Sequence, residues 1–113
     1  MRLLVFFDLP VVTNREKREY RRFRTFLLNE GYDMLQFSVY SRVCHGHEAT
    51  DKHLARLKRN LPPRGSIRAM VVTEKQYAKM QLLLGEPTAQ EKKVTSTQLT
   101  LFKKKTEMVP LFA

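Results

Sequence analysis

The sequence predicts a small α+β domain, because short apolar segments of strand type alternate with longer segments of helix type. Residues 2–8 are an apolar run that ends at a turn, which is typical of a buried strand. Residues 14–30 place apolar side chains at helical spacing among many charges. A chain of 113 residues with 42% hydrophobic residues can build one small core, so we expect a single domain.

The first strand and the first helix have clear boundaries in the sequence. Strand 2–8 closes with an Asp-Leu-Pro turn. Thr13 or Asn14 can cap a helix that runs to about Glu30, where Gly31 ends it. The apolar side of this helix consists of four residues at spacings that fit its period: Tyr20, Phe23, Phe26 and Leu27.

Two further strands are expected on either side of a second helix. Residues 35–40 alternate like a strand. One face would hold Leu35, Phe37 and Val39, and the other Gln36, Ser38 and Tyr40. Residues 47–60 follow as a helix, which a Pro-Pro-Arg-Gly turn ends. Its apolar line would be Leu54, Leu57 and Leu61. Residues 66–73 are rich in β-branched side chains and form the third expected strand.

The remaining residues predict a short helix at 74–80, a fourth strand at 82–84 and an edge strand at 97–102. We interpret the whole as the β-α-β-β-α-β order of a ferredoxin-like domain with an additional C-terminal edge strand. Residues 1–84 would be the ferredoxin-like core. Residues 85–113 would add a loop, the edge strand and a tail to the same domain.

A ferredoxin-like sheet has helices on one face only, so the helices do not cover its other face. Strand 2–8 is apolar on both of its faces, so the helix-free face should be covered as well. A chain of 113 residues has no spare element for this purpose. A second copy of the chain is the simplest cover, and we therefore expect a two-fold homodimer.

The charge balance points to a polyanionic partner. The chain has 21 Lys and Arg against 11 Asp and Glu, a net charge of +10, which favours nucleic acid over a membrane surface. Its apolar runs are too short to span a bilayer, and Asp8 and Pro10 interrupt any signal peptide. The single cysteine, Cys44, fits a reducing compartment, so we expect a cytoplasmic protein with no membrane partner.

Most of the positive charge that could bind phosphates lies on the two helices. The candidate nucleic-acid-binding residues are Arg15, Arg18 and Arg22 on the first helix and Lys52, Arg56 and Arg59 on the second. Arginine donates bidentately to phosphate oxygens. Solvated helix faces are usually charged, which leaves a purely structural role open. The excess of one sign favours binding, because residues 14–30 hold six Lys or Arg against three Glu.

Asp8 is the candidate metal ligand and catalytic residue. A carboxylate at the end of a buried strand offers the oxygen ligand that Mg²⁺ or Mn²⁺ prefers, and an ion beside a phosphodiester can activate water. A two-fold axis near the strand end would bring two copies of Asp8 to one shared ion. Alternatively, Asp8 caps the turn that follows it. Ser38 and Tyr40 could bind water or phosphate at this site, or they could serve an interface.

The histidines near the single cysteine do not form a recognisable site. Cys44, His45, His47 and His53 could suggest zinc, but their spacing does not match the usual paired motifs. A Cys/His nucleophile pair would need an orienting partner that the sequence does not mark. A loop with incidental histidines explains this segment better.

Several segments together resemble the small CRISPR-associated adaptation protein family. The first are Phe-Asp-Leu-Pro at 7–10, Tyr-Arg-Arg-Phe-Arg-Thr-Phe-Leu-Leu at 20–28, Gly31, and Gln-Phe-Ser-Val-Tyr at 36–40. Gly-Ser-Ile at 65–67 and the run from Val72 to Met80 resemble its type II branch. The resemblance covers roughly residues 2–102.

This resemblance implies a ferredoxin-like homodimer held between two dimers of the CRISPR-associated integrase. The assembly captures a double-stranded protospacer DNA and inserts it into the CRISPR array. The family is also known for metal-dependent endoribonuclease activity, so DNA or RNA would be the nuclease substrate. Its metal residue falls on Asp8, its serine and aromatic pair on Ser38 and Tyr40, and its helix arginine on Arg22. Its docking strand falls on residues 97–102, with Leu99, Leu101 and Phe102. Phe7 stands where the family often has tyrosine.

Two other functions remain as alternatives. One is a stand-alone metal-dependent endoribonuclease or DNase that works without an integrase. The other is a non-catalytic ferredoxin-like module that binds nucleic acid. Such modules usually present exposed aromatic side chains on the sheet. We expect Phe6, Phe37 and Tyr40 to be buried instead.

Overall fold

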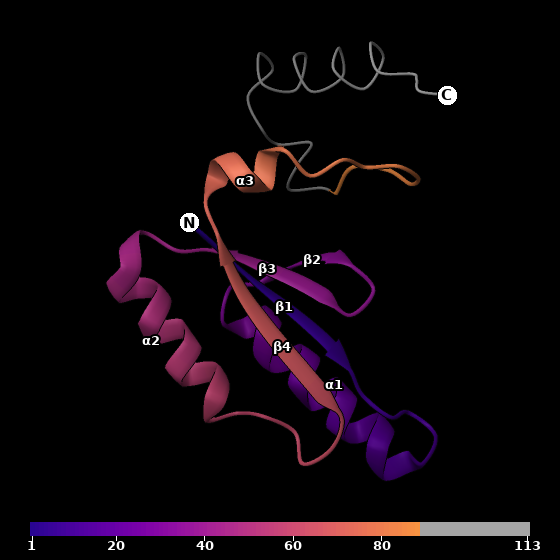
Figure 1. Cartoon of the computed structure of the whole chain (residues 1–113). Coiled ribbons are helices and arrows are strands. Elements are labelled where there is room, and N and C mark those ends of the chain that lie inside the picture. Colours follow the sequence, from indigo (N-terminus) through magenta and orange to yellow (C-terminus); the bar gives the residue numbers. More distant parts are fainter. Residues whose placement is uncertain (89–113) are drawn as a thin grey trace. The chain divides into compact units, whose positions relative to one another are not determined.

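The computed structural model describes residues 1–88, of which residues 1–80 form one compact unit. Its elements follow the order β-α-β-β-α-β with one further short helix (Figure 1). They are β1 (Arg2–Asp8), α1 (Asn14–Asn29), β2 (Asp33–Gln36), β3 (Val39–Val43), α2 (Gly46–Lys58), β4 (Ser66–Val72) and α3 (Glu74–Ala78). This order confirms the predicted α+β class and is compatible with a ferredoxin-like fold.

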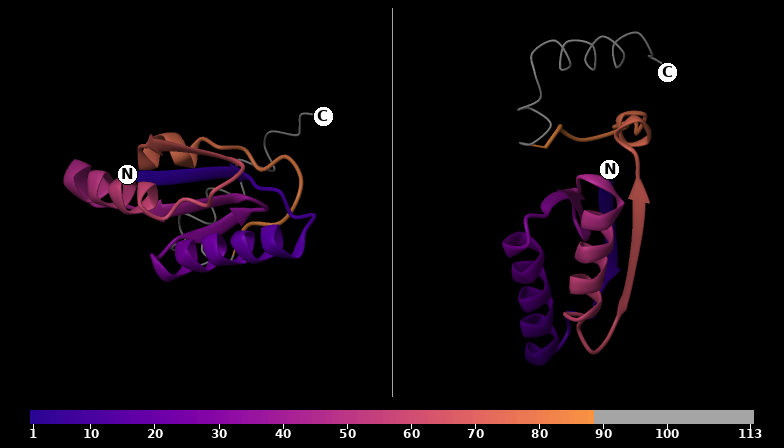
Figure 2. Two further views of the ribbon diagram at one scale, coloured as in Figure 1. Left: turned by 90° about the horizontal axis from the view of Figure 1, so that it is seen from below. Right: turned by 90° about the vertical axis from the view of Figure 1, so that its left-hand side faces the viewer.

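The four strands form one antiparallel sheet with the order β2-β3-β1-β4. β1 lies in the interior of the sheet and pairs with β3 on one side and β4 on the other. α1 and α2 pack on the same face of the sheet, which leaves the opposite face without these helices (Figure 2). None of the described helices has the length and apolar character needed to cross a membrane.

The core lies between the sheet and the two helices. Leu3, Val5 and Phe7 of β1 point into it, as the alternation of a strand requires. The Phe7 ring meets the Phe23 ring edge-on, with centroids 5.2 Å apart. Phe23 and Leu27 are buried, and Tyr20 and Phe26 pack against them, so the predicted apolar side of α1 is confirmed.

The predicted apolar line of α2 is only partly correct. Leu57 is buried and Leu54 packs against the core. Leu61 is 50% exposed, because the helix ends at Lys58 and the chain has already left the helical path.

The ends of α1 are held as the sequence predicts. Thr13 is the N-cap and forms a capping box with Glu16, in which each side chain accepts a hydrogen bond from the other residue's backbone N–H. At the other end, Gly31 has φ of 88° and its N–H donates to the Leu28 carbonyl at 3.1 Å. This left-handed turn is the usual glycine ending of a helix. Both signals fix where the chain enters and leaves the helical layer.

The expected strand at 35–40 is wrong, because the chain turns in its middle. β2 ends at Gln36 and β3 begins at Val39, and Ser38 between them has φ of 63°. The turn breaks the alternation, so Phe37 is 83% exposed instead of sharing a face with Val39. The single predicted strand is in fact a hairpin, and this hairpin completes the β-α-β-β-α-β order.

The expected fourth strand at 82–84 is also wrong. These residues belong to no strand in the described part of the chain, and Leu83 and Leu84 are 87% and 93% exposed. Leucine runs give no directional signal of their own, so they do not distinguish a strand from an irregular segment. The predicted edge strand at 97–102, with Leu99, Leu101 and Phe102, lies outside the described residues.

The helix-free face of the sheet carries the other side chains of β1, which are Arg2, Leu4, Phe6 and Asp8. Leu4 is buried, whereas Phe6 is 36% exposed and Met70 of β4 is 52% exposed. The face therefore combines exposed apolar side chains with a carboxylate at one end. The two-fold dimer through this face stays a prediction.

Candidate metal and nucleic-acid site

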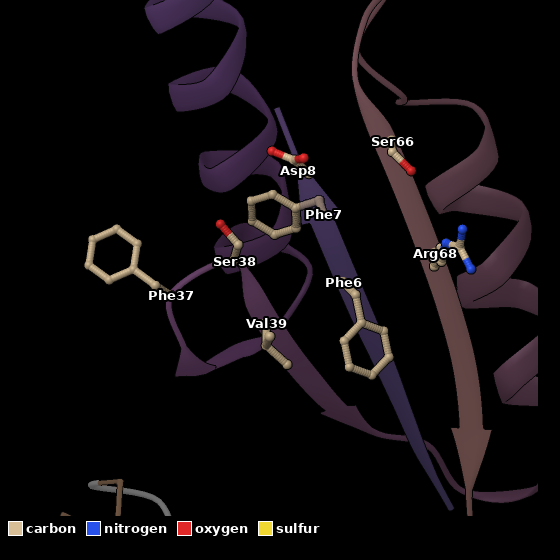
Figure 3. A pocket seen from close by; sticks show the side chains of 8 residues that line it. All are labelled: Phe6, Phe7, Asp8, Phe37, Ser38, Val39, Ser66 and Arg68. Atoms are coloured by element: carbon tan, nitrogen blue, oxygen red, sulfur yellow. The ribbon is translucent and has the colours of Figure 1, made fainter. Parts of the chain in front are cut away.

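A shallow hollow of about 300 Å³ lies at the end of β1 that carries Asp8. The strand pairing brings its walls together, because Asp8 lies opposite Ser66 of β4 and the Phe7 N–H donates to the Ser38 carbonyl at 3.0 Å. Eight residues line the hollow (Figure 3): Phe6, Phe7, Asp8, Phe37, Ser38, Val39, Ser66 and Arg68.

The Asp8 side chain has no partner within residues 1–88, since it forms no ion pair and accepts no hydrogen bond there. The alternative in which it caps the following turn is therefore not supported. An exposed carboxylate at the rim of a hollow remains available to a ligand. A carboxylate must be available in this way if it is to bind a metal ion.

One chain supplies few ligands for a metal ion. The residues from 1 to 88 contain no group of three His, Cys, Asp or Glu side chains that could hold one. Mg²⁺ often keeps several waters and binds through only one or two carboxylates. Asp8, with the hydroxyls of Ser38 and Ser66 in the same hollow, fits such a hydrated ion. Asp8 is the one carboxylate among the described residues that line this hollow.

Gly65 holds the end of β1 in place, a role that the sequence did not indicate beyond its position in a turn. It has φ of 99°. A Cβ atom built there would lie 2.5 Å from Leu9 Cδ2 and 2.7 Å from the Asp8 carbonyl oxygen. Only glycine allows so close an approach. The turn before β4 thus packs directly on the backbone that positions Asp8.

Ser38 and Tyr40 do not share a face as predicted. Ser38 lines the hollow, but Tyr40 is 1% exposed and lies in the core, with its ring stacked 5.6 Å from the Phe7 ring. The turn at Ser38 changes the alternation, and Tyr40 consequently points toward the helices. A direct contact of Tyr40 with a ligand at Asp8 is therefore excluded in this arrangement. Tyr40 instead supports the Phe7 ring within the core.

The predicted nucleic-acid-binding residues of α1 lie on its solvent-facing side. Arg15, Arg18 and Arg22 are all exposed, and Arg15 pairs with Glu19 at 3.3 Å. Arg18 and Arg22 have no ion-pair partner among the described residues. These two guanidinium groups are thus available to phosphates.

The candidates on α2 divide into two kinds. Lys52 and Arg59 are exposed. Arg56 instead pairs with Glu30 at the end of α1, with 3.1 Å between Nη1 and Oε2. Its guanidinium joins the two helices, so α2 offers fewer available charges than its sequence suggests.

A polar cluster lies beside this ion pair, between α1, β3 and α2. The Arg42 Nε–H donates to the Glu30 carbonyl at 2.7 Å, which places a cation at the C-terminal end of α1. His53 Nδ1 is buried and has no hydrogen-bond partner among residues 1–88, and the pKa of His53 lies below its ordinary value. Burial is the main cause of the lowered pKa, followed by the positive charges of Arg42 and Arg56 and a smaller effect of Lys52. The negative charge of Glu30 raises the pKa and so opposes them.

This cluster predicts a loss of stability in mild acid. The unfolded chain protonates His53 near pH 6.5, whereas the folded chain does so only at lower pH. The free energy of unfolding should therefore keep the full contribution of His53 above pH 6.5. It should fall as the pH drops below this value. Urea titrations of the parent and of His53→Gln at several pH values measure this. A shallower decline in the variant supports the assignment, and equal slopes contradict it.

The cysteine and the histidines of the 44–47 loop differ in their exposure. Cys44 is 1% exposed, while His45 and His47 are exposed and no metal-binding group forms among the described residues. A buried thiol is a poor nucleophile because substrates do not reach it. The interpretation of this segment as a loop with incidental histidines stays a prediction.

Two aromatic residues differ from expectation in their exposure. Phe6 and Phe37 are exposed in the single chain, at 36% and 83%, although the sequence predicts that both are buried. Tyr40 is buried as expected. Exposed aromatic side chains on the sheet are a feature of simple nucleic-acid-binding modules. The exposure of these two residues therefore removes the argument against such a module that their expected burial had provided.

Comparison with known proteins places this chain in a family. The sequence model described as "CRISPR associated protein Cas2" matches residues 1–80. A CRISPR-associated endoribonuclease Cas2 of Acidovorax ebreus is 59% identical over 102 residues, which cover 90% of this chain and 100% of that protein. Proteins of the same name are 45% identical in Campylobacter jejuni, over 90% of this chain and 71% of theirs, and 49% identical in Streptococcus mutans, over 76% and 79%. The chain therefore belongs to the Cas2 family of CRISPR-associated proteins.

Proposed function

We propose that the protein is the non-integrase subunit of a CRISPR adaptation complex: a basic homodimer that binds protospacer duplex DNA and bridges integrase dimers. The observation that carries the proposal is the helix-free face of the sheet. There Asp8 has no partner within residues 1–88 and lies on the same face as the exposed side chains of Phe6 and Met70.

A second copy is the occupant that this face favours. Exposed apolar side chains on one sheet face are stabilised by burial against another such face. A two-fold axis through the face repeats the same residues on both sides. It would bring the two Asp8 carboxylates toward each other and supply a second carboxylate, which residues 1–88 of one chain do not place in the hollow.

The same packing leaves the helices on the outside of the dimer. α1 and α2 cover the opposite face of the sheet (Figure 2), so Arg18, Arg22, Lys52 and Arg59 would stay exposed in both copies. Two such surfaces form a positive track for a phosphate backbone. The net charge of +10 per chain supports strong, salt-dependent binding of duplex DNA.

The Asp8 site supports metal-dependent cleavage of phosphodiesters. Asp8 would hold Mg²⁺ or Mn²⁺, with Ser38 and Ser66 beside it. Such an ion lowers the pKa of bound water and stabilises charge on the phosphate. The buried Phe7 and Tyr40 rings, together with Gly65, keep the strand end that carries the carboxylate in one position.

A stand-alone endoribonuclease is the second candidate, because the relatives carry that name. The distinguishing measurement is cleavage of single- and double-stranded RNA and DNA by the purified chain with Mg²⁺, in the presence and absence of chelator. Efficient cleavage without an integrase, combined with no effect on integration, favours this candidate.

Charge reversal on α1 should weaken duplex binding. In a chain with Arg18→Glu and Arg22→Glu we expect a higher Kd and a smaller salt dependence, by about 0.9 in the log–log slope for each phosphate that the protein no longer neutralises. Fluorescence anisotropy at several salt concentrations measures both. Lys75→Glu, a reversal of an exposed charge on α3, is the matched control. An unchanged slope in the double variant excludes α1 from the DNA-binding surface.

The experiment that tests the proposed function is reconstitution with a CRISPR-associated integrase. We expect the two proteins to copurify and to insert a duplex of spacer length into a CRISPR array. Omission of either protein should remove insertion. Integration at full rate by the integrase alone overturns the proposal.

A further inference from the structure

Arg68 is a second charged residue in the hollow that carries Asp8. It lies on β4 opposite Phe6, and Ser66, two residues earlier, lies opposite Asp8. Asp8 and Arg68 are therefore diagonal neighbours on the same face of two paired strands, where such positions are about 7–8 Å apart. Both line the same hollow (Figure 3).

The Arg68 guanidinium has no ion-pair or hydrogen-bond partner within residues 1–88 and is exposed. The other arginine on this face differs. Arg2 pairs with Glu74 at 2.9 Å and lies over the Tyr77 ring, 4.0 Å from its centroid. Arg2 therefore stabilises the fold, whereas Arg68 has no such use within the described residues.

A phosphate at Asp8 needs a positive group near it, because the carboxylate and the phosphodiester repel each other. Arginine suits this task, since its planar fork donates two parallel hydrogen bonds to phosphate oxygens. We propose that Arg68 binds the phosphodiester that lies at the Asp8 ion. This inference rests on the proposed metal site at Asp8 and assigns the group that holds its substrate.

The proposal predicts that nucleic acid and metal strengthen each other's binding through Arg68. Binding couplings are reciprocal, so the effect is measurable on the metal alone. Mn²⁺ binding to the purified full chain is followed by the electron paramagnetic resonance signal of free Mn²⁺. The titration is run without oligonucleotide, with a short DNA duplex and with a short RNA strand. We expect an oligonucleotide to lower the Mn²⁺ Kd of the parent about 10-fold, the size of one charged hydrogen bond.

Three variants identify the group responsible. Arg68→Ala should bind Mn²⁺ alone at least as tightly as the parent, because a positive charge beside the ion is removed, but lose the tightening by oligonucleotide. Arg68→Lys should keep part of the tightening, because it keeps the charge without the fork. Lys75→Ala, which removes an exposed charge elsewhere, should keep all of it.

The outcomes separate this inference from the function on which it rests. Full tightening in Arg68→Ala, or no tightening in a parent that binds Mn²⁺, overturns the role of Arg68 and leaves the Asp8 site in place. A parent that does not bind Mn²⁺ overturns the metal site itself, and the role of Arg68 with it.

Discussion

Replacement of Asp8 by alanine is expected to reduce metal-dependent cleavage more than about 100-fold. A change of a residue that only supports a metal ligand costs about 10–100-fold in affinity or activity, and Asp8 is the proposed direct ligand. The rate of cleavage of a labelled oligonucleotide under single-turnover conditions with Mg²⁺ or Mn²⁺ measures the effect. The residual rate should match that of the parent in chelator.

The same variant should keep its fold and, measured without divalent metal, its affinity for duplex DNA. The Asp8 side chain is exposed and has no hydrogen bond within the described residues, so its loss should change stability by no more than about 0.5 kcal/mol. Apart from Arg68, the arginines proposed to bind DNA belong to α1 and α2, which lie across the sheet from Asp8. Equal cleavage by the variant and the parent removes Asp8 from the mechanism.

Replacement of Gly65 by alanine is expected to destabilise the protein by about 2–6 kcal/mol. Backbone strain at a positive φ and insertion of a methyl group into a filled space each cost about 1–3 kcal/mol. The new Cβ would press on Leu9 Cδ2 at 2.5 Å and on the Asp8 carbonyl oxygen at 2.7 Å. Chemical denaturation followed by circular dichroism measures the change in the free energy of unfolding.

Gly46 provides a matched control for this substitution. Its φ of 89° is similar, but a Cβ there would meet nothing within 4 Å. Gly46→Ala should therefore carry the backbone strain alone and cost about 1–3 kcal/mol less than Gly65→Ala. If the two variants are equally stable, the close contact between Gly65 and the end of β1 adds nothing to the cost of the substitution.

The sequence predicted the elements whose signals are local. β1 is a continuous apolar run, and α1 has both a capping residue at Thr13 and a terminating glycine at Gly31. These signals act within a few residues of each other, and the structure has the same boundaries to within one residue. The choice of Asp8 as a candidate also rests on a local rule, because a carboxylate at the end of a buried strand stands out from the sequence alone, and its role as a metal ligand stays a prediction.

The features that the sequence did not predict depend on contacts between distant segments or on a turn without a typical residue. Ser38 adopts a left-handed conformation that glycine or asparagine would have signalled, so the sequence predicted one strand where β2 and β3 form a hairpin. That error put Tyr40 on the wrong face. The approach of Gly65 to Asp8, and the place of Arg68 beside it, follow from the pairing of β1 with β4.

Sedimentation equilibrium of the purified chain, together with duplex binding in dilute buffer, tests the central claim most directly. Association through the helix-free sheet face predicts a particle of twice 13.3 kDa that binds short DNA duplexes tightly at low salt. A particle of 13.3 kDa at high concentration, with no affinity for duplexes, contradicts it.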